Sequence, residues 1–581
     1  MSHTVSIEIN GRNVEAAQGE MLLASLRRAG VDVPTLCNLD GGFYAGLHPA
    51  GACRICVVEV EGQRSLVPAC AFPVNAGMKV KTQTDRVVNA RRTIIELLLA
   101  DHPDDCLFCE RNENCRLREL AGSFGIRGRR FIGQRTTYPV DSSGESIVRD
   151  AEKCIKCGKC VRVCDEVQGV ACIDFIGRGS QTIVGTAFDE GINVSSCINC
   201  GQCVAICPTG ALVGKSHIER VMAALRDENL HVVVQHAPAV SVTLGEEFGI
   251  APGVDVMGMM HAALRQMGFA AVFDTSFSAD LTIMEEASEL IHRVKTGGVL
   301  PMFTSCSPGW IKYVETFYPQ NIPNLSTCKS PQQMLGAVIK TYYAEKKGLD
   351  PKNIYSVSVM PCTAKKFEAS RPEMGRGGYR DVDAVLTTRE LAQMIRRFNL
   401  DLNLQPEGAD SPFGMRSSAG KIFGTTGGVM EAAVRSAYYF MTGSELGDLK
   451  VEAVRGLDGI KEAHLDVAGI KIGVAVVNGL GNAKRLLEQI NAGEKKDIHF
   501  VEVMTCSSGC VGGGGQPYGT DIGKVQLRTR ELYNIDAAET LRVSHTNTEV
   551  TQIYKDYFGE PNSHKAHELL HTHYQQREVL T

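Results

Sequence analysis

The stretch Val501-Glu-Val-Met-Thr-Cys506-Ser-Ser-Gly-Cys510-Val-Gly-Gly-Gly-Gly515 joins a strand-like apolar run to two cysteines and four consecutive glycines. Cysteine thiolates are soft ligands that suit iron and iron–sulfur clusters. Glycines let the backbone adopt left-handed turns and approach a bulky inorganic group closely. We therefore interpret this stretch as a metal-binding loop at the end of a strand.

Two further cysteines lie on loops with apolar flanks. Cys306 lies in Phe303-Thr-Ser-Cys306-Ser-Pro-Gly-Trp310, and Cys362 lies in Val359-Met-Pro-Cys362-Thr-Ala-Lys-Lys366. Together with Cys506 and Cys510, these residues supply the thiolates for one [4Fe–4S] cubane held by three separate loops. The cysteines upstream of these loops look like a path that leads electrons to this point.

The first domain is expected to hold a [2Fe–2S] cluster. Residues 4–15 predict a hairpin around Asn10-Gly11, because Asn-Gly suits a tight primed turn. A helix is predicted at 21–29, and four cysteines follow it: Cys37, Cys53, Cys56 and Cys70. The first gap is longer than in plant-type ferredoxins, but the Cys-x2-Cys pair with two distant cysteines favours [2Fe–2S] over the alternative, a zinc site.

A second ligand set surrounds a single histidine. A helix is predicted at 94–100, and the spacing His102-x3-Cys106-x2-Cys109-x5-Cys115 follows it. Four ligands can bind one [4Fe–4S] cluster if the imidazole replaces a thiolate, which changes the net charge of the cluster and with it the potential. A surface histidine is the alternative. Residues 120–150 are interpreted as a connecting segment.

An internal repeat follows. Cys154-x2-Cys157-x2-Cys160-x3-Cys164 recurs 43 residues later as Cys197-x2-Cys200-x2-Cys203-x3-Cys207-Pro208. This is the bacterial two-cluster ferredoxin pattern, in which the fourth cysteine of each run binds the cluster of the other run. Cys172 has no partner by spacing, and we interpret it as a buried small residue.

The second half of the chain alternates strand-like and helical patterns, which predicts an α/β domain with largely parallel, twisted sheets and flanking helices. Strands are predicted from residue 231 and at 354–359, 383–386, 472–477 and 501–504. Helices are predicted at 288–294, 332–344, 389–398 and 431–438. No P-loop or dinucleotide-binding glycine motif occurs in the required context, so nucleotide binding by this chain is not indicated. The domains we expect are a β-grasp [2Fe–2S] domain (1–80), a His/Cys3 domain (81–140), an α+β two-cluster ferredoxin-like domain (141–215) and the catalytic domain (216–581).

Composition narrows the possible functions. The chain has 581 residues, 21 cysteines, a net charge of −5 and 6% aromatic residues, so nucleic acid is not an expected partner. The start of the sequence lacks the pattern of a signal peptide, and no apolar run is long enough to span a membrane. Clustered cysteines in such a chain favour metal ligands over disulfides. We expect a cytoplasmic protein whose one [2Fe–2S] and three [4Fe–4S] clusters carry electrons to a buried redox site.

The three loops identify the family. The chain resembles the iron–iron (FeFe) hydrogenases along its length, through Thr304-Ser-Cys306-Ser-Pro-Gly-Trp310, Met360-Pro-Cys362-Thr-Ala-Lys365-Lys-Phe-Glu368 and Glu502-Val-Met504-Thr-Cys506-Ser-Ser-Gly-Cys510. The front end and the closing segment around His571-Thr-His-Tyr574 are similar to the large multicluster type. The resemblance implies an H-cluster, in which Cys510 would bridge a [4Fe–4S] cubane to a two-iron subcluster with CO, cyanide and a bridging dithiolate amine. It also implies the reversible conversion of H2 into protons and electrons.

The resemblance assigns further roles. Lys365 matches the lysine that binds a cyanide, and Met360 and Met504 match methionines that pack on the two-iron unit. Glu286, Glu289 and Ser326 match a proton relay, in which a buried carboxyl group with a raised pKa suits proton transfer. Without the resemblance, a solvated lysine, core methionines and helix-surface carboxylates would explain the same residues.

One position departs from the family. The first loop usually has two adjacent cysteines, of which the first relays protons and the second binds the cubane, but this chain has Cys306-Ser307. In strict register Ser307 occupies the ligand position, although serine oxygen is a poor ligand for iron–sulfur clusters. Our hypothesis is that Cys306 binds the cubane through a small local shift and that Ser307 acts in the relay.

Three functions remain open from the sequence. The front end and the Cys306-Ser307 variant look like those of catalytic subunits in NAD(P)-linked hydrogenases, some of them electron-bifurcating, whose partner subunits bind flavin and nicotinamide. A monomer that exchanges electrons with ferredoxin is the second arrangement. The alternatives to H2 catalysis are an electron-transfer subunit, since residues 1–210 also resemble the iron–sulfur subunit of respiratory complex I and of some formate dehydrogenases, and a hydrogenase-like H2 sensor or cluster-assembly protein.

Overall fold

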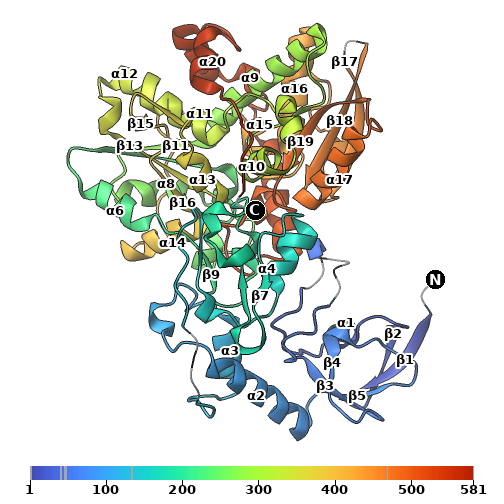
Figure 1. Ribbon diagram of the computed structural model, residues 1–581. Coiled ribbons are helices and arrows are strands. Elements are labelled where there is room, and N and C mark those ends of the chain that lie inside the picture. The colour runs from blue at the N-terminus through green and yellow to red at the C-terminus, as the bar shows by residue number, and fades with distance from the viewer. Residues whose placement is uncertain are drawn as a thin grey trace.

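The computed structural model describes residues 3–39, 42–44, 47, 49–132, 135, 137–467 and 469–579. Figure 1 shows the front domains, in blue to teal, below the larger half, in green to red. The first β-sheet domain, with α1, lies at the lower right of this view, and α2 and α3 lie at the bottom.

The first domain is a five-stranded sheet in the order β2-β1-β5-β3-β4. Its strands are β1 (Thr4–Ile9), β2 (Arg12–Ala17), β3 (Val57–Val60), β4 (Val67–Pro68) and β5 (Lys79–Lys81). β1 and β2 form the predicted hairpin, with Asn10 and Gly11 both at positive φ in the turn. β1 runs parallel to β5, and α1 (Leu22–Arg28) packs its apolar side on this sheet, which gives the predicted β-grasp arrangement.

The second segment is more helical than the sequence predicted. α2 spans Asp85–Ala100, so it begins nine residues before the predicted start at residue 94, and the Thr84 side chain accepts a hydrogen bond from the Val87 amide as its N-cap. The apolar pattern is weak in the first turns, where the buried Arg91 takes a core position and donates to the Val57 carbonyl oxygen at 2.8 Å. The prediction that 120–150 is only a connecting segment was wrong at both ends, where α3 (Arg116–Ser123) and β6 (Ile147–Arg149) lie.

The domain that is predicted to hold two clusters has very short elements around its cysteines. β6 pairs with β9 (Leu212–Gly214), and β7 (Asp174–Ile176) pairs with β8 (Ile183–Gly185). The repeat places α4 (Lys159–Arg162) after Cys157 and α5 (Gln202–Ile206) after Cys200, each preceded by a glycine in the left-handed region. Cysteines form a large part of this small core.

The catalytic half contains two four-stranded sheets. One has the order β11-β10-β13-β16, with every pairing parallel. The other has the order β12-β19-β18-β17, with only β17 antiparallel. These strands are β10 (His231–His236), β11 (Ala271–Asp274), β12 (Met302–Phe303), β13 (Ile354–Met360), β16 (Ala384–Thr387), β17 (Ile460–Val467), β18 (Ile470–Asn478) and β19 (Ile498–Met504). In Figure 1, β13 and β16 lie to the left and β18 and β19 to the right, so the prediction of largely parallel sheets is confirmed.

Helices cover and join the two sheets. The longest is α9 (Thr275–Thr296), which contains the predicted helix at 288–294 and contacts α11, α15 and α16. The other helices of this half are α6 (Ile218–Arg226), α7 (Pro238–Ser241), α8 (Met257–Gln266), α10 (Pro308–Phe317), α11 (Pro331–Val338), α12 (Ala344–Lys347), α13 (Ala364–Ser370), α14 (Thr388–Arg397), α15 (Ser418–Lys421), α16 (Gly428–Thr442), α17 (Leu480–Asn491), α18 (Ile522–Ala538), α19 (Thr548–Ile553) and α20 (His564–Leu570). The buried Glu502 carboxylate accepts the amides of Gly427 and Met430 at 2.7 Å, which ties β19 to the start of α16.

The segment after α20 adds to the inner loops of this half. Cys328 and His571 form an antiparallel bridge, and the Thr572 amide donates to the Thr327 carbonyl oxygen at 2.7 Å. Within the described ranges, no helix is long and apolar enough to cross a membrane.

Candidate functional site

The three cysteine loops each follow a parallel strand. Cys306 follows β12, Cys362 follows β13 and Cys506 follows β19. Because β13 belongs to one sheet while β12 and β19 belong to the other, the loops meet between the two sheets. Ligands of parallel α/β sheets bind beyond the carboxyl ends of the strands, which is where these cysteines lie.

One cavity collects the predicted residues of the catalytic centre. It is lined mostly by apolar surface and includes Cys306, Ser307, Met360, Cys362, Lys365, Met504, Cys506 and Cys510. Ala237, Pro238 and Phe423 complete its apolar walls. The structure therefore brings the four cysteines, both methionines and the lysine together, although they are far apart in the sequence.

The thiols of this cavity fit a cationic metal group. Burial raises the pKa of Cys510 to about 12, and it also raises the pKa values of Cys362 and Cys506. A thiolate in such apolar surroundings needs a strong positive charge close by, and Lys365 is a single cation. Iron bound to the sulfurs would supply that charge, so this donor set suits the cubane of an H-cluster.

Lys365 is held in place at the cavity wall. Its Nζ donates to the Cys306 carbonyl oxygen at 3.1 Å and to Glu368 Oε2 at 2.9 Å. Glu368 in turn accepts hydrogen bonds from Ser330 and Gln332. This network fixes the ammonium group beside the cysteine loop, so a freely solvated lysine does not describe it.

Cys306 and Ser307 face different neighbours. The Ser307 hydroxyl lies 2.7 Å from Thr505 Oγ1 and accepts the Thr505 amide at 3.4 Å, next to Cys506. Burial and the neighbouring Glu286 carboxylate raise the pKa of the Cys306 thiol. The serine side chain thus contacts the loop that follows β19, and both Cys306 and Ser307 line the cavity.

The predicted relay residues lie on α9 and, for Ser326, on the segment between α10 and α11. Glu286 is 1% exposed, and one of its carboxyl oxygens has no hydrogen-bond partner among the described residues. Burial, as the main cause, and the nearby Glu289 charge, as the second cause, raise the pKa of Glu286 to about 8. The Ser326 hydroxyl donates to Glu289 at 2.9 Å, and Glu289 pairs with Arg293 at 2.6 Å. Glu286 and Ser326 are buried, whereas the side chains of Glu289 and Arg293 are partly exposed, so the group extends toward the surface.

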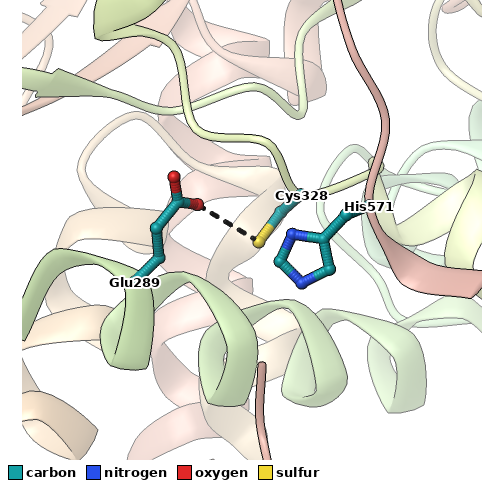
Figure 2. Close-up of side chains that lie close together, drawn as sticks. All are labelled: Glu289, Cys328 and His571. Carbon is teal, nitrogen blue, oxygen red and sulfur yellow. Dashed lines mark hydrogen bonds between the residues drawn. The ribbon is translucent and has the colours of Figure 1, made fainter. Parts of the chain in front are cut away.

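Figure 2 shows the outer end of this relay, where Glu289, Cys328 and His571 converge from α9, an inner loop and the C-terminal segment. The Cys328 thiol lies 3.8 Å from Glu289 Oε2. These groups are close enough to hold a cation. However, His571 Nδ1 contacts Thr327 Oγ1 at 2.8 Å and Nε2 contacts Glu285 at 3.0 Å, so both ring nitrogens are already engaged. We interpret the group as a hydrogen-bonded network.

Sequence reasoning missed the residues of this network: Glu285, Arg293, Thr327, Cys328 and His571. Glu285 and His571 lie 286 residues apart, and no local pattern connects them. Only the spacing of Glu285, Glu289 and Arg293 by four residues was available as a signal, because such residues share one face of a helix.

The predicted ligands of the first domain converge. The Cys53 amide donates to Cys37 Sγ at 3.5 Å, and Cys70 hydrogen-bonds with Cys37. The Cys70 thiol also lowers the pKa of Cys56 to about 7. Four neighbouring thiols in a β-grasp domain suit a [2Fe–2S] cluster.

The His102 set is partly assembled. His102 is 9% exposed, its Nδ1 has no hydrogen-bond partner among the described residues, and burial lowers its pKa. A neutral imidazole with an unused nitrogen is the state that binds a metal. Cys109 and Cys115 are half-buried and lie near each other, whereas Cys106 is exposed.

In the ferredoxin-like repeat, the fourth cysteine of each run lies among the cysteines of the other run, an arrangement that fits the predicted pattern. Cys154, Cys157, Cys160 and Cys207 line one small cavity. Cys164 lies instead among Cys197, Cys200 and Cys203 of the second run. Cys172 is not simply a buried small residue, because it is only half-buried and its sulfur contacts Cys164.

Contacts join these sites in series. Cys37, Cys53, Cys115 and Cys157 share one hydrophobic cluster, which brings together the first domain, the His102 set and the first ferredoxin-like run. At the other end, Gln202 of the second run donates to Cys506 Sγ at 3.1 Å. No pattern in the sequence indicates this last contact, which spans 304 residues.

Comparison with known families assigns the class. The family "Iron only hydrogenase large subunit, C-terminal domain" matches residues 230–514, and "Iron hydrogenase small subunit" matches 522–577. In front of them lie a "2Fe-2S iron-sulfur cluster binding domain" (2–85), an "NADH-ubiquinone oxidoreductase-G iron-sulfur binding region" (91–130) and an "NADH-quinone oxidoreductase subunit 3, ferredoxin-like domain" (144–213). The chain belongs to the iron-only (FeFe) hydrogenases and is an oxidoreductase that acts on H2.

Some individual relatives match over nearly the whole chain, and others match over part of it. The "NADP-reducing hydrogenase subunit HndD" of Solidesulfovibrio fructosivorans is 46% identical over 99% of this chain and 100% of its own length. "Iron hydrogenase 1" of Clostridium pasteurianum is 44% identical over 98% and 99%. The structure of a variant of [FeFe]-hydrogenase HydA1 from Chlamydomonas reinhardtii is 45% identical with a TM-score of 0.57, covering 62% of this chain and 99% of that one. A cytosolic Fe–S cluster assembly factor of Xenopus tropicalis is also similar, at 34% identity over 60% of this chain and 75% of its own length.

Proposed function

We propose that this chain interconverts H2 with protons and electrons at an H-cluster, and that one [2Fe–2S] and three [4Fe–4S] clusters carry the electrons. The observation that supports this most is the Gln202 hydrogen bond to Cys506, at 3.1 Å. This hydrogen bond connects the second ferredoxin-like run directly to a cysteine of the catalytic cavity. An electron path that ends at this cavity is what an H2 enzyme requires.

The protein residues have distinct tasks in this proposal. Cys362, Cys506 and Cys510 would hold the cubane, Cys510 would also bridge to the two-iron unit, and the bound group supplies an open iron and a nearby amine base for H2 cleavage. Met360 and Met504 keep that side of the cavity apolar, and Lys365 offers an ammonium donor for a cyanide.

The proton moves through the chain's own groups. The Glu286 carboxyl group, with its pKa near 8, exchanges a proton near neutral pH at small cost. It interacts with the Cys306 thiol and with Ser326, the Ser326 hydroxyl donates to Glu289, and Arg293 pairs with Glu289 at the outer end. Removing a positioned proton carrier lowers rates by about 10²–10⁴-fold in other enzymes.

The fourth cubane ligand is either Cys306 or Ser307. The hypothesis from the sequence, with Cys306 as ligand and Ser307 in the relay, remains a prediction. The contact of Ser307 with Thr505 and the interaction of Cys306 with Glu286 favour the reverse, in which Ser307 would be the ligand and Thr505 would hydrogen-bond to its oxygen. Cys306→Ala and Ser307→Ala variants decide between them, because only the variant that lacks the ligand loses the electron paramagnetic resonance (EPR) signal of that cubane.

The electron partner is proposed to be a set of subunits that bind flavin and NAD(P), with ferredoxin as the second acceptor. The name of the relative from Solidesulfovibrio fructosivorans, an NADP-reducing hydrogenase subunit, supports this choice. The chain with such subunits would then reduce NADP⁺ under H2, whereas the chain alone would reduce only ferredoxin or a dye.

Infrared spectroscopy tests the proposal. The chain is produced together with hydrogenase maturation proteins, kept anaerobic, and measured in the CO and cyanide stretching region. Sharp bands that shift under H2 are expected. If fully matured protein shows iron–sulfur clusters but no such bands, the proposal fails and an electron-transfer subunit without H2 chemistry becomes the better description.

A further inference from the structure

Cys172 is a fifth thiol at the second ferredoxin-like cluster site. Its Sγ lies 3.5 Å from Cys164 Sγ, and it also hydrogen-bonds with the Cys197 thiol. Both neighbours belong to the four cysteines expected to bind one cubane. The cysteine spacing gives Cys172 no role, so its contact with two ligands needs an explanation of its own.

The backbone turns sharply to bring Cys172 to this place. Cys164 lies in the π-helical turn Val163–Val167, and the amides of Val170 and Ala171 both donate back to its carbonyl oxygen, at 2.9 and 3.3 Å. Ala171 has φ 50°, in the left-handed region. A residue with a Cβ costs on the order of 1 kcal/mol there, and such strain clusters at ligand clamps and functional sites. The strained turn directs the next side chain toward Cys164.

The first ferredoxin-like site has no equivalent thiol. Cys207 corresponds to Cys164 by the repeat, and its sulfur neighbour is the Thr209 hydroxyl, at 3.8 Å. Among the described residues that line the cavity of that site, the only cysteines are Cys154, Cys157, Cys160 and Cys207. The repeat therefore provides an internal comparison in which one site has a spare sulfur and the other does not.

We propose that Cys172 is an exchangeable ligand of the second cubane. While Cys164 binds iron, the Cys172 thiol donates an S–H hydrogen bond to its sulfur. In the exchange, the Fe–S bond to Cys164 breaks, an Fe–S bond to Cys172 forms, and the Cys172 proton moves to Cys164. No electron is gained or lost, so the cluster keeps its oxidation state. This inference rests on the proposed presence of a [4Fe–4S] cluster at this site.

Substitutions in the full-length chain test the exchange. Each variant is reconstituted anaerobically with ferrous iron and sulfide, and iron per chain and the EPR spectrum of the reduced clusters are measured. Cys164→Ala should keep the iron content of the unaltered chain, because Cys172 takes over. Cys164→Ala/Cys172→Ala should lose about four iron atoms and one EPR signal. Cys207→Ala, the matched control, should lose the same amount as a single substitution.

Two outcomes separate this inference from the proposed function. If Cys164→Ala alone loses as much iron as the double variant, Cys172 does not exchange and the inference is wrong. If Cys200→Ala, which removes an undisputed member of the second run, loses no iron, the cubane itself is absent and the proposed electron path fails. As an independent readout, Cys172→Ala alone should keep its iron while the reduction potential of this one cluster falls, because a hydrogen bond to a ligand sulfur is removed.

Discussion

At the scale of single residues, Glu286 combines deep burial with a carboxyl group that keeps its proton near neutral pH. It is fully enclosed on α9, and its charge would lie close to that of Glu289. The burial and the nearby charge that suit proton transfer also mean that ionised Glu286 destabilises the folded state. Activity and stability are therefore coupled at this position.

The stability of the catalytic domain should depend on pH through Glu286. The folded state binds this proton more tightly than the unfolded state, so the unfolding free energy decreases as pH rises above about 4.5 and levels off above about 8. The upper limit of this change is about 5 kcal/mol at roughly 1.4 kcal/mol per pKa unit. We expect Glu286→Gln to remove it.

The single tryptophan makes this measurable. Trp310 is fully buried in the catalytic half, so its fluorescence during urea unfolding reports this domain. The difference in urea midpoint between Glu286→Gln and the unaltered chain should grow between pH 5 and pH 8. Glu228→Gln, at an exposed position, is the control. A constant difference across this range would contradict the assignment.

Activity should respond to the same residue in another way. Glu286→Gln should lower H2 turnover by about 10²-fold or more, because the amide cannot carry a proton. The infrared bands of the CO and cyanide ligands should remain, since Glu286 is not among the residues that would hold the H-cluster. Loss of those bands would indicate a structural role instead.

At the scale of elements, close packing between loops sets the distances between cluster sites. The turn after Cys207 lies against the His102 set, and a Cβ at Gly210 would lie 2.6 Å from Cys109 Sγ. The Arg116 amide also donates to the Pro208 carbonyl oxygen at 3.0 Å. A sulfur bound to a cluster cannot rotate away from such a contact.

Gly210→Ala should therefore disturb the His102 cluster selectively. We expect about four iron atoms to be lost or the EPR signal of that cluster to broaden, while the second ferredoxin-like cluster is unchanged. Gly214→Ala, four residues later in β9, has nothing within 4 Å of its Cβ and should have no effect. Equal spectra for both variants would show that Cys109 is free to move.

The elements also show what the sequence can and cannot predict. Strands such as β13 and β19 are rich in Ile, Val and other apolar residues, so their positions were predicted within a few residues. α9 was predicted only in its last part, because its buried first half carries Asp280, Glu285 and Glu286, which conceal the apolar face. α2 was shortened for a similar reason, since a buried Arg91 anchors it to the first domain.

At the scale of the whole molecule, the two parts of the chain differ in what stabilises them. The catalytic half has two four-stranded sheets with large apolar cores. Between residues 141 and 215 the strands have three residues each, and cysteines make up much of the core. The ligand positions there were predictable because short-range spacing sets them. Cys306, Cys362 and Cys506 were grouped from their residue type and loop context alone, because their convergence follows from the packing of two sheets and no local spacing indicates it.

Removal of iron should unfold the front of the molecule first. Ligands that bind only the folded state stabilise it, and small domains depend on them most. After chelation, amides of residues 147–214 should exchange hydrogen rapidly, while those of β10 and β13 should stay protected. Hydrogen-exchange mass spectrometry measures this difference. Uniform exchange along the chain would show that the clusters do not carry the stability of the front domains.

The strand bridge between Cys328 and His571 also has a consequence for biosynthesis. Thr327 and His571 are in contact but lie 244 residues apart, so at 5–20 residues per second a ribosome makes the second roughly 10–50 s after the first. During that interval the front domains have already emerged and can acquire iron. The wall around Glu289 is still open, because its C-terminal part has not been translated. Order of synthesis thus makes the sealing of the relay a late event.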